Sequence, residues 1–236
     1  MATTTVRGHV SRALDFFDRD DIYMGIGRST PWADEANPPA PSTDATELEE
    51  VIGYKKLEYC YLVVPDNVNG TISYRDTKWR IVTPKFEALT VGNTDDTATT
   101  VKLTSVNGLK VHDKLQIGNY VGQITAIDTV NSTVTMDTPF GFDIPAGTLV
   151  KGGTLVEGAR WAYVEAHLRY DELPLTQYRQ IGVFSRLVKN DGVPAGKVAL
   201  LPNEVKDPGI LEVIDNRRVV NRQIDQKEYL SIIIEF

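Results

Sequence analysis

Short apolar runs of strand length cover much of this 236-residue chain, with Pro, Gly, Asn and Asp between them, and this pattern is typical of β-strands. "RWAYVEAHL" alternates between apolar and polar residues, and "KLEYCYLVVP", "YRQIGVF" and "EYLSIIIEF" are further runs of this kind. Helical spacing predicts an amphipathic helix over residues 8–19. Asp44 followed by Glu47 forms a capping-box pattern, which predicts a second helix with Leu48 on its apolar face. The pattern predicts a mainly β fold with one or two short helices.

A change in composition indicates an inserted domain. The chain has thirteen arginines, but none lies between Arg80 and Arg160, and this stretch is rich in Thr, Val, Gly and Asp. Its short strands follow each other closely, with turn signals between them, as in a small closed barrel or sandwich. We therefore predict that residues 87–157 are a small β domain inserted between two parts of a host β-sandwich domain, residues 1–86 and 158–236.

Five apolar residues of the host domain are predicted to lie in its core. Trp79 and Trp161 flank the insertion, as if the host strands resume on either side of it. Ile232, Ile234 and Phe236 belong to a terminal strand that is apolar on both faces. Such a strand is central in a sandwich or buried against a partner, and we expect these five residues to be structural.

Charge and composition exclude several functional classes. The net charge of −7 argues against nucleic acid as a partner, because phosphate binding requires a basic face. No run approaches the roughly 18 apolar residues of a membrane span, and the N-terminus lacks the apolar core of a signal peptide. We expect a protein made in the cytosol that leaves it only as part of an assembly. The single cysteine, Cys60, fits a small buried residue of a strand better than a nucleophile.

The segment "GIGRSTPWADEANPPAPSTD", residues 25–44, begins like a phosphate-binding loop. A dinucleotide fingerprint requires a third glycine and then a helix whose N-terminus holds the phosphates. Here Thr30 takes the place of that glycine and Pro31 follows, which biases the backbone of Thr30 towards an extended conformation. The segment therefore predicts no nucleotide site.

Few residues suggest catalysis or metal binding. Glu165 and His167 lie on the same face of a predicted strand and could act as an orienting group and a general base, although a solvated strand face is the simpler interpretation. The stretch "NTDDTATT" lacks the glycine and the bidentate glutamate of a calcium loop. We predict no catalytic residue, no metal and no cofactor.

The proline-rich segment, residues 28–43, is here called the arm. A stiff arm loses little entropy on docking, and Trp and Arg dominate interface energetics. Arg28, Trp32, Pro38 and Pro39 are therefore candidate interface residues. An alternative with equal weight is that Trp32 covers the edge of its own core.

Two parts of the chain resemble a known family. "IGRSTPWADEANPPAPSTD" is similar to the "FGRS-PW…PP-P-TD" segment near the start of the baseplate wedge protein encoded by the eighth gene of T-even-type contractile-tailed bacteriophages. The last 28 residues resemble the end of that protein, with an acidic residue-Asn-Arg triplet, an Asp-Gln pair and a closing apolar strand; "YRQIGVF" also resembles a family segment. The triplet match adds Arg217, predicted at a turn, to the candidate interface residues.

The resemblance implies a non-enzymatic, immunoglobulin-like β-sandwich subunit that forms a homodimer and contacts other tail proteins in the virion. Two differences weaken the resemblance: this chain is shorter than the T-even protein, and residues 87–157 have no counterpart in that protein that aligns. A rival prediction is a carbohydrate-binding or hydrolytic module that uses the insertion. It would require exposed aromatic residues, and the insertion has only Tyr120, Phe140 and Phe142.

Overall fold

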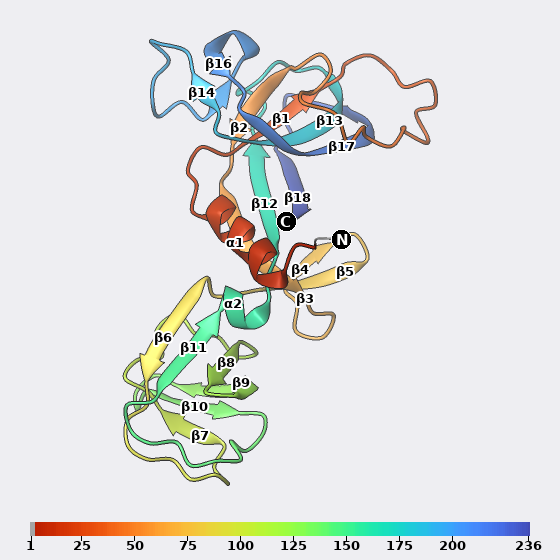
Figure 1. Ribbon diagram of the computed structural model, residues 1–236. Helices are drawn as coiled ribbons and strands as arrows, with labels where there is room; N and C mark the ends of the chain where they lie inside the picture. Colours follow the sequence, from red (N-terminus) through yellow and green to blue (C-terminus); the bar gives the residue numbers. More distant parts are fainter. Residues whose placement is uncertain (1–2) are drawn as a thin grey trace. The chain divides into compact units, whose positions relative to one another are not determined.

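The computed structural model describes residues 3–236, and Figure 1 shows their helices and strands. The fold is mainly β, as predicted. The first half of the chain contains α1 (Val6–Phe17), β1 (Tyr23–Gly27), β2 (Gly53–Lys56), β3 (Tyr59–Pro65), β4 (Ile72–Tyr74), β5 (Thr77–Ile81), β6 (Lys85–Leu89), β7 (Thr100–Lys102) and β8 (Lys114–Ile117). The second half contains β9 (Tyr120–Asp128), β10 (Thr133–Met136), β11 (Leu149–Gly153), α2 (Thr154–Glu157), β12 (Trp161–Leu168), β13 (Gln177–Ser185), β14 (Val188–Lys189), β15 (Ala199–Leu200), a 3-10 turn (Pro202–Glu204), β16 (Val205–Asp207), β17 (Ile210–Asn221) and β18 (Glu228–Glu235).

The chain divides into two compact units. Among the described residues, unit 1 contains residues 3–17, 61–162 and 235–236, and unit 2 contains residues 18–60 and 163–234. One sheet of the fold has the order β18-β12-β3-β5-β4.

A small barrel lies within unit 1. Its six strands have the order β6-β11-β8-β9-β10-β7. A bridge between Thr90 and Leu103, with a 2.8 Å hydrogen bond from the Val91 amide to the Lys102 carbonyl, joins the two end strands and closes the sheet. Its core is a separate cluster that includes the fully buried Leu115, Ile117, Ile124, Val134, Ile144 and Val150. These strands lie within residues 85–153, and the independent folding of the predicted insertion, residues 87–157, stays a prediction.

Arg80, on β5, connects the barrel to the rest of unit 1. Its guanidinium donates to Asp66 at 3.2 Å, to Asp113 at 3.1 Å and to Glu157 at 2.9 Å. The side chains of Asp113 and Glu157 are each 1% exposed. A buried arginine that loses such partners retains a desolvated charge, so this network fixes the barrel to β5.

The main sheet of unit 2 has the order β15-β2-β1-β13-β17. Strand β1 lies in its centre and is buried along its whole length. It pairs antiparallel with β13, so that Gly25 lies opposite Gly182 and Gly27 opposite Gln180. Strand β17 forms one edge and pairs with β13 through two irregularities in register.

The predicted helix after Asp44 is wrong: the structure has no helix there. Leu48 is buried at 2% exposure against the sheet. The Glu49 amide donates to the Gln180 side chain at 2.8 Å, and Glu50 has a φ of 47°, which a right-handed helix does not allow. The backbone of this segment therefore bonds to the sheet rather than to itself. The first predicted helix is confirmed as α1, with Val10, Ala13 and Phe16 buried.

The residues predicted for the core lie as follows. Ile232 and Ile234 of β18 are buried at 2% and 4% exposure. In unit 1, half-buried Phe236 packs on Phe16 with ring centroids 5.0 Å apart, and half-buried Trp79 and Trp161 pack edge to face at 5.8 Å. The immunoglobulin-like details of the fold stay a prediction. Among residues 3–236, no helix is long and apolar enough to cross a membrane.

Candidate interaction surface around the arm

The Gly-x-Gly pair that opens the arm makes room for a second segment. A Cβ on Gly25 would lie 2.8 Å from the Phe184 ring, and one on Gly27 would lie 2.7 Å from the Glu49 carbonyl oxygen. Residues i and i+2 of a strand share a face, so both glycines lie under Leu48 and Glu49. Their spacing serves close packing on β1, which accounts for the glycines without a phosphate.

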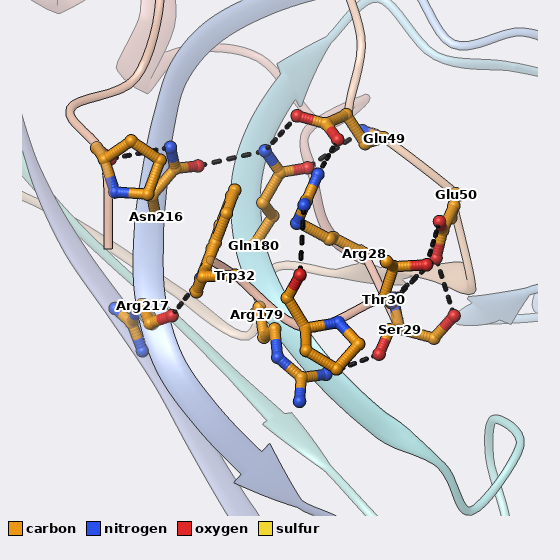
Figure 2. A network of polar contacts seen from close by, with 12 residues as sticks. Arg28, Ser29, Thr30, Trp32, Glu49, Glu50, Arg179, Gln180, Asn216 and Arg217 are labelled. Carbon is orange, nitrogen blue, oxygen red and sulfur yellow. Dashed lines mark hydrogen bonds and ion pairs between the residues drawn. The ribbon is translucent and has the colours of Figure 1, made fainter. Parts of the chain in front are cut away.

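The loop after these glycines nevertheless binds an anion, the side chain of Glu50. The Ser29 amide and hydroxyl donate to Glu50 Oε2 at 2.9 and 2.6 Å, and the Thr30 amide donates to the same oxygen at 3.0 Å. The Thr30 hydroxyl donates to Oε1 at 2.5 Å. The hydrogen bonds from Ser29 and then Thr30 lower the pKa of Glu50 to about 2, because they stabilise the charged form. Figure 2 shows these contacts.

Arg28 and Trp32 pack on each other at the base of the arm. The Arg28 guanidinium lies 3.9 Å from the centre of the Trp32 ring and pairs with the Glu49 carboxylate. The Trp32 ring nitrogen donates to the Arg217 carbonyl oxygen at 2.8 Å, and Trp32 is only 7% exposed. Trp32 therefore covers the edge of its own core, which was the alternative interpretation of this residue.

Side chains of β13 and β17 hold the rest of the arm by its backbone carbonyls (Figure 2). Arg179 donates to the Ser29 carbonyl at 2.5 Å and to the Glu35 carboxylate at 2.7 Å. Asn216 donates to the Pro39 carbonyl at 2.9 Å and also accepts from Gln180 at 2.9 Å. On the same strand, the side chain of Arg218 donates to the Ala36 carbonyl at 3.0 Å.

The structure shows where the candidate interface residues lie. Arg28, Trp32 and Arg217 make contacts within their own chain, Pro38 is half-buried and Pro39 is exposed. Arg217 is not at a turn but inside β17, where it donates to the Asp215 carboxylate at 2.9 Å and to the Ser231 carbonyl at 3.3 Å. A role of these residues at a subunit contact stays a prediction.

His167 lies between two carboxylates in unit 2. Its Nε2 is 2.5 Å from Glu165, as the strand spacing predicted, and its Nδ1 is 2.7 Å from Glu58. The rings of Tyr59 and Tyr229 pack against it with centroids 5.7 and 4.6 Å away. Burial raises the pKa of Glu165, but hydrogen bonds from Tyr163 and His167 outweigh this effect and lower it. A general base requires a free ring nitrogen, and here both nitrogens have partners.

The remaining candidates from the sequence are Cys60, a metal site and the aromatic residues of the insertion. Burial raises the pKa of the Cys60 thiol to about 12, which opposes a role as a nucleophile. In residues 3–236, no group of three His, Cys, Asp or Glu side chains is placed to hold a metal. Of the three aromatic residues of the predicted insertion, residues 87–157, Phe140 is buried, Tyr120 packs on it at 5.1 Å and Phe142 is 38% exposed. This is a poor platform for a sugar.

Comparison with known proteins identifies the family. The family model described as "baseplate wedge 3 tail fiber network component" matches residues 1–94 and 92–236. The chain belongs to this family. It is also similar to "Virion protein 3" of Enterococcus phage phiEF24C, with 28% identity over 243 residues that cover 100% of this chain and 96% of that protein. The protein is thus a structural baseplate component of a bacteriophage tail, as the resemblance implied.

Most residues that hold the arm were missed at the sequence level. Arg179, Gln180 and Asn216 lie far from the arm in sequence, Glu50 lies seven residues after its end, and no local motif links these four residues to it. One signal was present: Arg179 and Gln180 are polar residues inside the apolar run "YRQIGVF", and both are buried, at 3% and 2% exposure. Buried polar side chains require partners, so this pair indicates a polar network.

Proposed function

We propose that this baseplate component is a non-enzymatic subunit that holds neighbouring tail proteins together through sheet packing and through the exposed side of its arm. The family match across residues 1–94 and 92–236 carries this proposal. The arm supports it, because β13 and β17 hold its carbonyls while Ala36, Asn37, Pro39 and Ala40 are exposed. A fixed segment loses little conformational entropy when a neighbour packs on it.

The absence of enzymatic activity is part of the proposal. The one His-carboxylate pair that sequence analysis suggested has both ring nitrogens occupied, and Cys60 has a raised pKa. Assays of the purified protein for hydrolysis of nucleotides, esters and host surface glycans should give no turnover. Activity that is lost in His167→Gln would contradict the proposal.

The proposal also includes a homodimer that enters the virion by assembly in the host cytoplasm with other baseplate proteins. Light scattering after gel filtration gives the mass of the purified chain, and twice 26.2 kDa is expected. Co-expression with the other tail proteins of the same phage should give a stable complex. If the chain is absent from purified virions by mass spectrometry, the structural role itself is wrong.

A further inference from the structure

Unit 2 has an apolar groove beside the anion-binding loop of the arm. Its volume is about 610 Å³, within the range of ligand and peptide sites. Its lining comes from four stretches of the chain: Ser29; Glu50 to Ile52; Pro174 and Thr176; and Leu201 to Asn203. Leu201 is 36% exposed, so an apolar surface faces solvent there.

One wall of the groove carries a fixed negative charge. Glu50 lines the groove and is itself exposed. The four hydrogen bonds from Ser29 and Thr30 hold its carboxylate in one orientation. Within residues 3–236, no lysine or arginine forms an ion pair with Glu50: Arg28 pairs with Glu49, and Lys55 pairs with Glu58 and Glu172. An oriented carboxylate without a cation, next to an apolar surface, is complementary to a segment that carries both an apolar anchor and a positive charge.

We propose that this groove binds a segment of another baseplate protein in which an aliphatic anchor lies within a few residues of a lysine or arginine. The anchor packs on Val51, Pro174 and Leu201, and the cation pairs with Glu50. This inference rests on the proposed structural function and names the class of partner at one surface. Docking costs little here, because the carboxylate is already oriented before the partner arrives.

Charge complementarity favours this occupant over two others. The arm of the same chain is already held on β13 and β17 by Arg179, Asn216 and Arg218. A second copy that docks groove to groove would place like charges of Glu50 near each other, which is unfavourable.

The test uses the parent phage with its own gene deleted and a plasmid that supplies the chain. A photo-crosslinking amino acid replaces Asn203, which is exposed and lines the groove. Irradiated virions are digested and the cross-linked peptides are sequenced by mass spectrometry. We expect a peptide from a different virion protein with an aliphatic residue and a lysine or arginine close together.

Two variants and a control measure the contribution of the groove. With the crosslinker in place, Leu201→Asp should lower the cross-link yield at least tenfold, and Glu50→Gln should lower it several-fold while the apolar contact remains. Val188→Asp, a change at a residue that is 47% exposed and outside the groove, should leave the yield unchanged. Melting curves of the purified variants separate misfolding from loss of binding, which is required because Glu50→Gln also alters the hydrogen bonds from Ser29 and Thr30.

The outcomes are distinct. A cross-link to a second copy of this chain, a cross-link to a segment without a basic residue, or no cross-link although the chain is present in the virion would each overturn the proposal. Equal cross-link yields for the chain with the crosslinker alone and for the same chain with Glu50→Gln would overturn the ion pair. If the unmodified chain is missing from the virion, the proposed function fails rather than this inference alone.

Discussion

Replacement of Trp32 by alanine should destabilise the subunit strongly, although Trp32 belongs to a proline-rich arm. The ring is 7% exposed, lies under the Arg28 guanidinium and donates a hydrogen bond to the Arg217 carbonyl. Truncation of a buried tryptophan to alanine costs about 3–5 kcal/mol, which includes the cavity that remains. This is a large fraction of a typical unfolding free energy of about 5–15 kcal/mol.

Urea denaturation followed by far-UV circular dichroism measures this effect without reliance on tryptophan fluorescence. Trp32→Phe separates the two contributions: most of the ring volume stays, while the Arg217 carbonyl loses its donor at a cost of about 1–3 kcal/mol. Tyr170→Ala is the control, because Tyr170 is an aromatic residue of unit 2 with 48% exposure. A loss of less than about 1 kcal/mol in Trp32→Ala, equal to that of the control, would refute the argument, since it would mean that the ring is not part of the core.

Three further predictions concern other parts of the chain. Folding lowers the pKa of Glu50 from 4.5 to about 2, so the ionised carboxylate stabilises the fold fully above pH 4.5 and this stabilisation is lost as the pH falls towards 2. In Glu50→Gln the free energy of unfolding should change less with pH over this range, and a curve equal to that of the unmodified chain would contradict this. The His167 ring should hold one orientation, because each of its nitrogens faces a carboxylate; NMR of the ring tests this, and rapid averaging between two ring orientations would contradict it. Replacement of residues 87–157 by a short Gly/Ser linker should leave the remaining chain folded. The same deletion with Arg80→Met should be more stable, because the deletion removes Asp113 and Glu157 and leaves the buried Arg80 with Asp66 alone. Loss of cooperative unfolding in both deletion variants would show that the barrel is required.

Periodicity was sufficient to predict most of the strands. Alternating runs such as "RWAYVEAHL" and "YRQIGVF" became β12 and β13, and the closely spaced short runs between Arg80 and Arg160 became the barrel. These predictions succeeded because the pattern of burial along a strand is local information.

The failures have a common physical cause. Asp44 and Glu47 have the spacing of a capping box, yet tertiary contacts of Leu48 and Glu49 with β1 and β13 outweigh the local preference for helix. The turn predicted at Arg217 failed likewise, because β13 pairs with β17 on both sides of this residue. The Glu50 carboxylate bound by Ser29 and Thr30 lies about twenty residues away in the sequence, and only the tertiary structure brings it close to them.

The way in which the arm is fastened has a consequence for sequence variation. Arg179, Arg218 and Asn216 bind the carbonyls of Ser29, Ala36 and Pro39, and a carbonyl is present whatever side chain a residue carries. Substitutions at Ala36 or Pro39 can therefore change the outer chemistry of the arm while its anchorage is preserved. On the role proposed for the arm, such substitutions would change its contact with a neighbouring protein one residue at a time while the arm stays anchored.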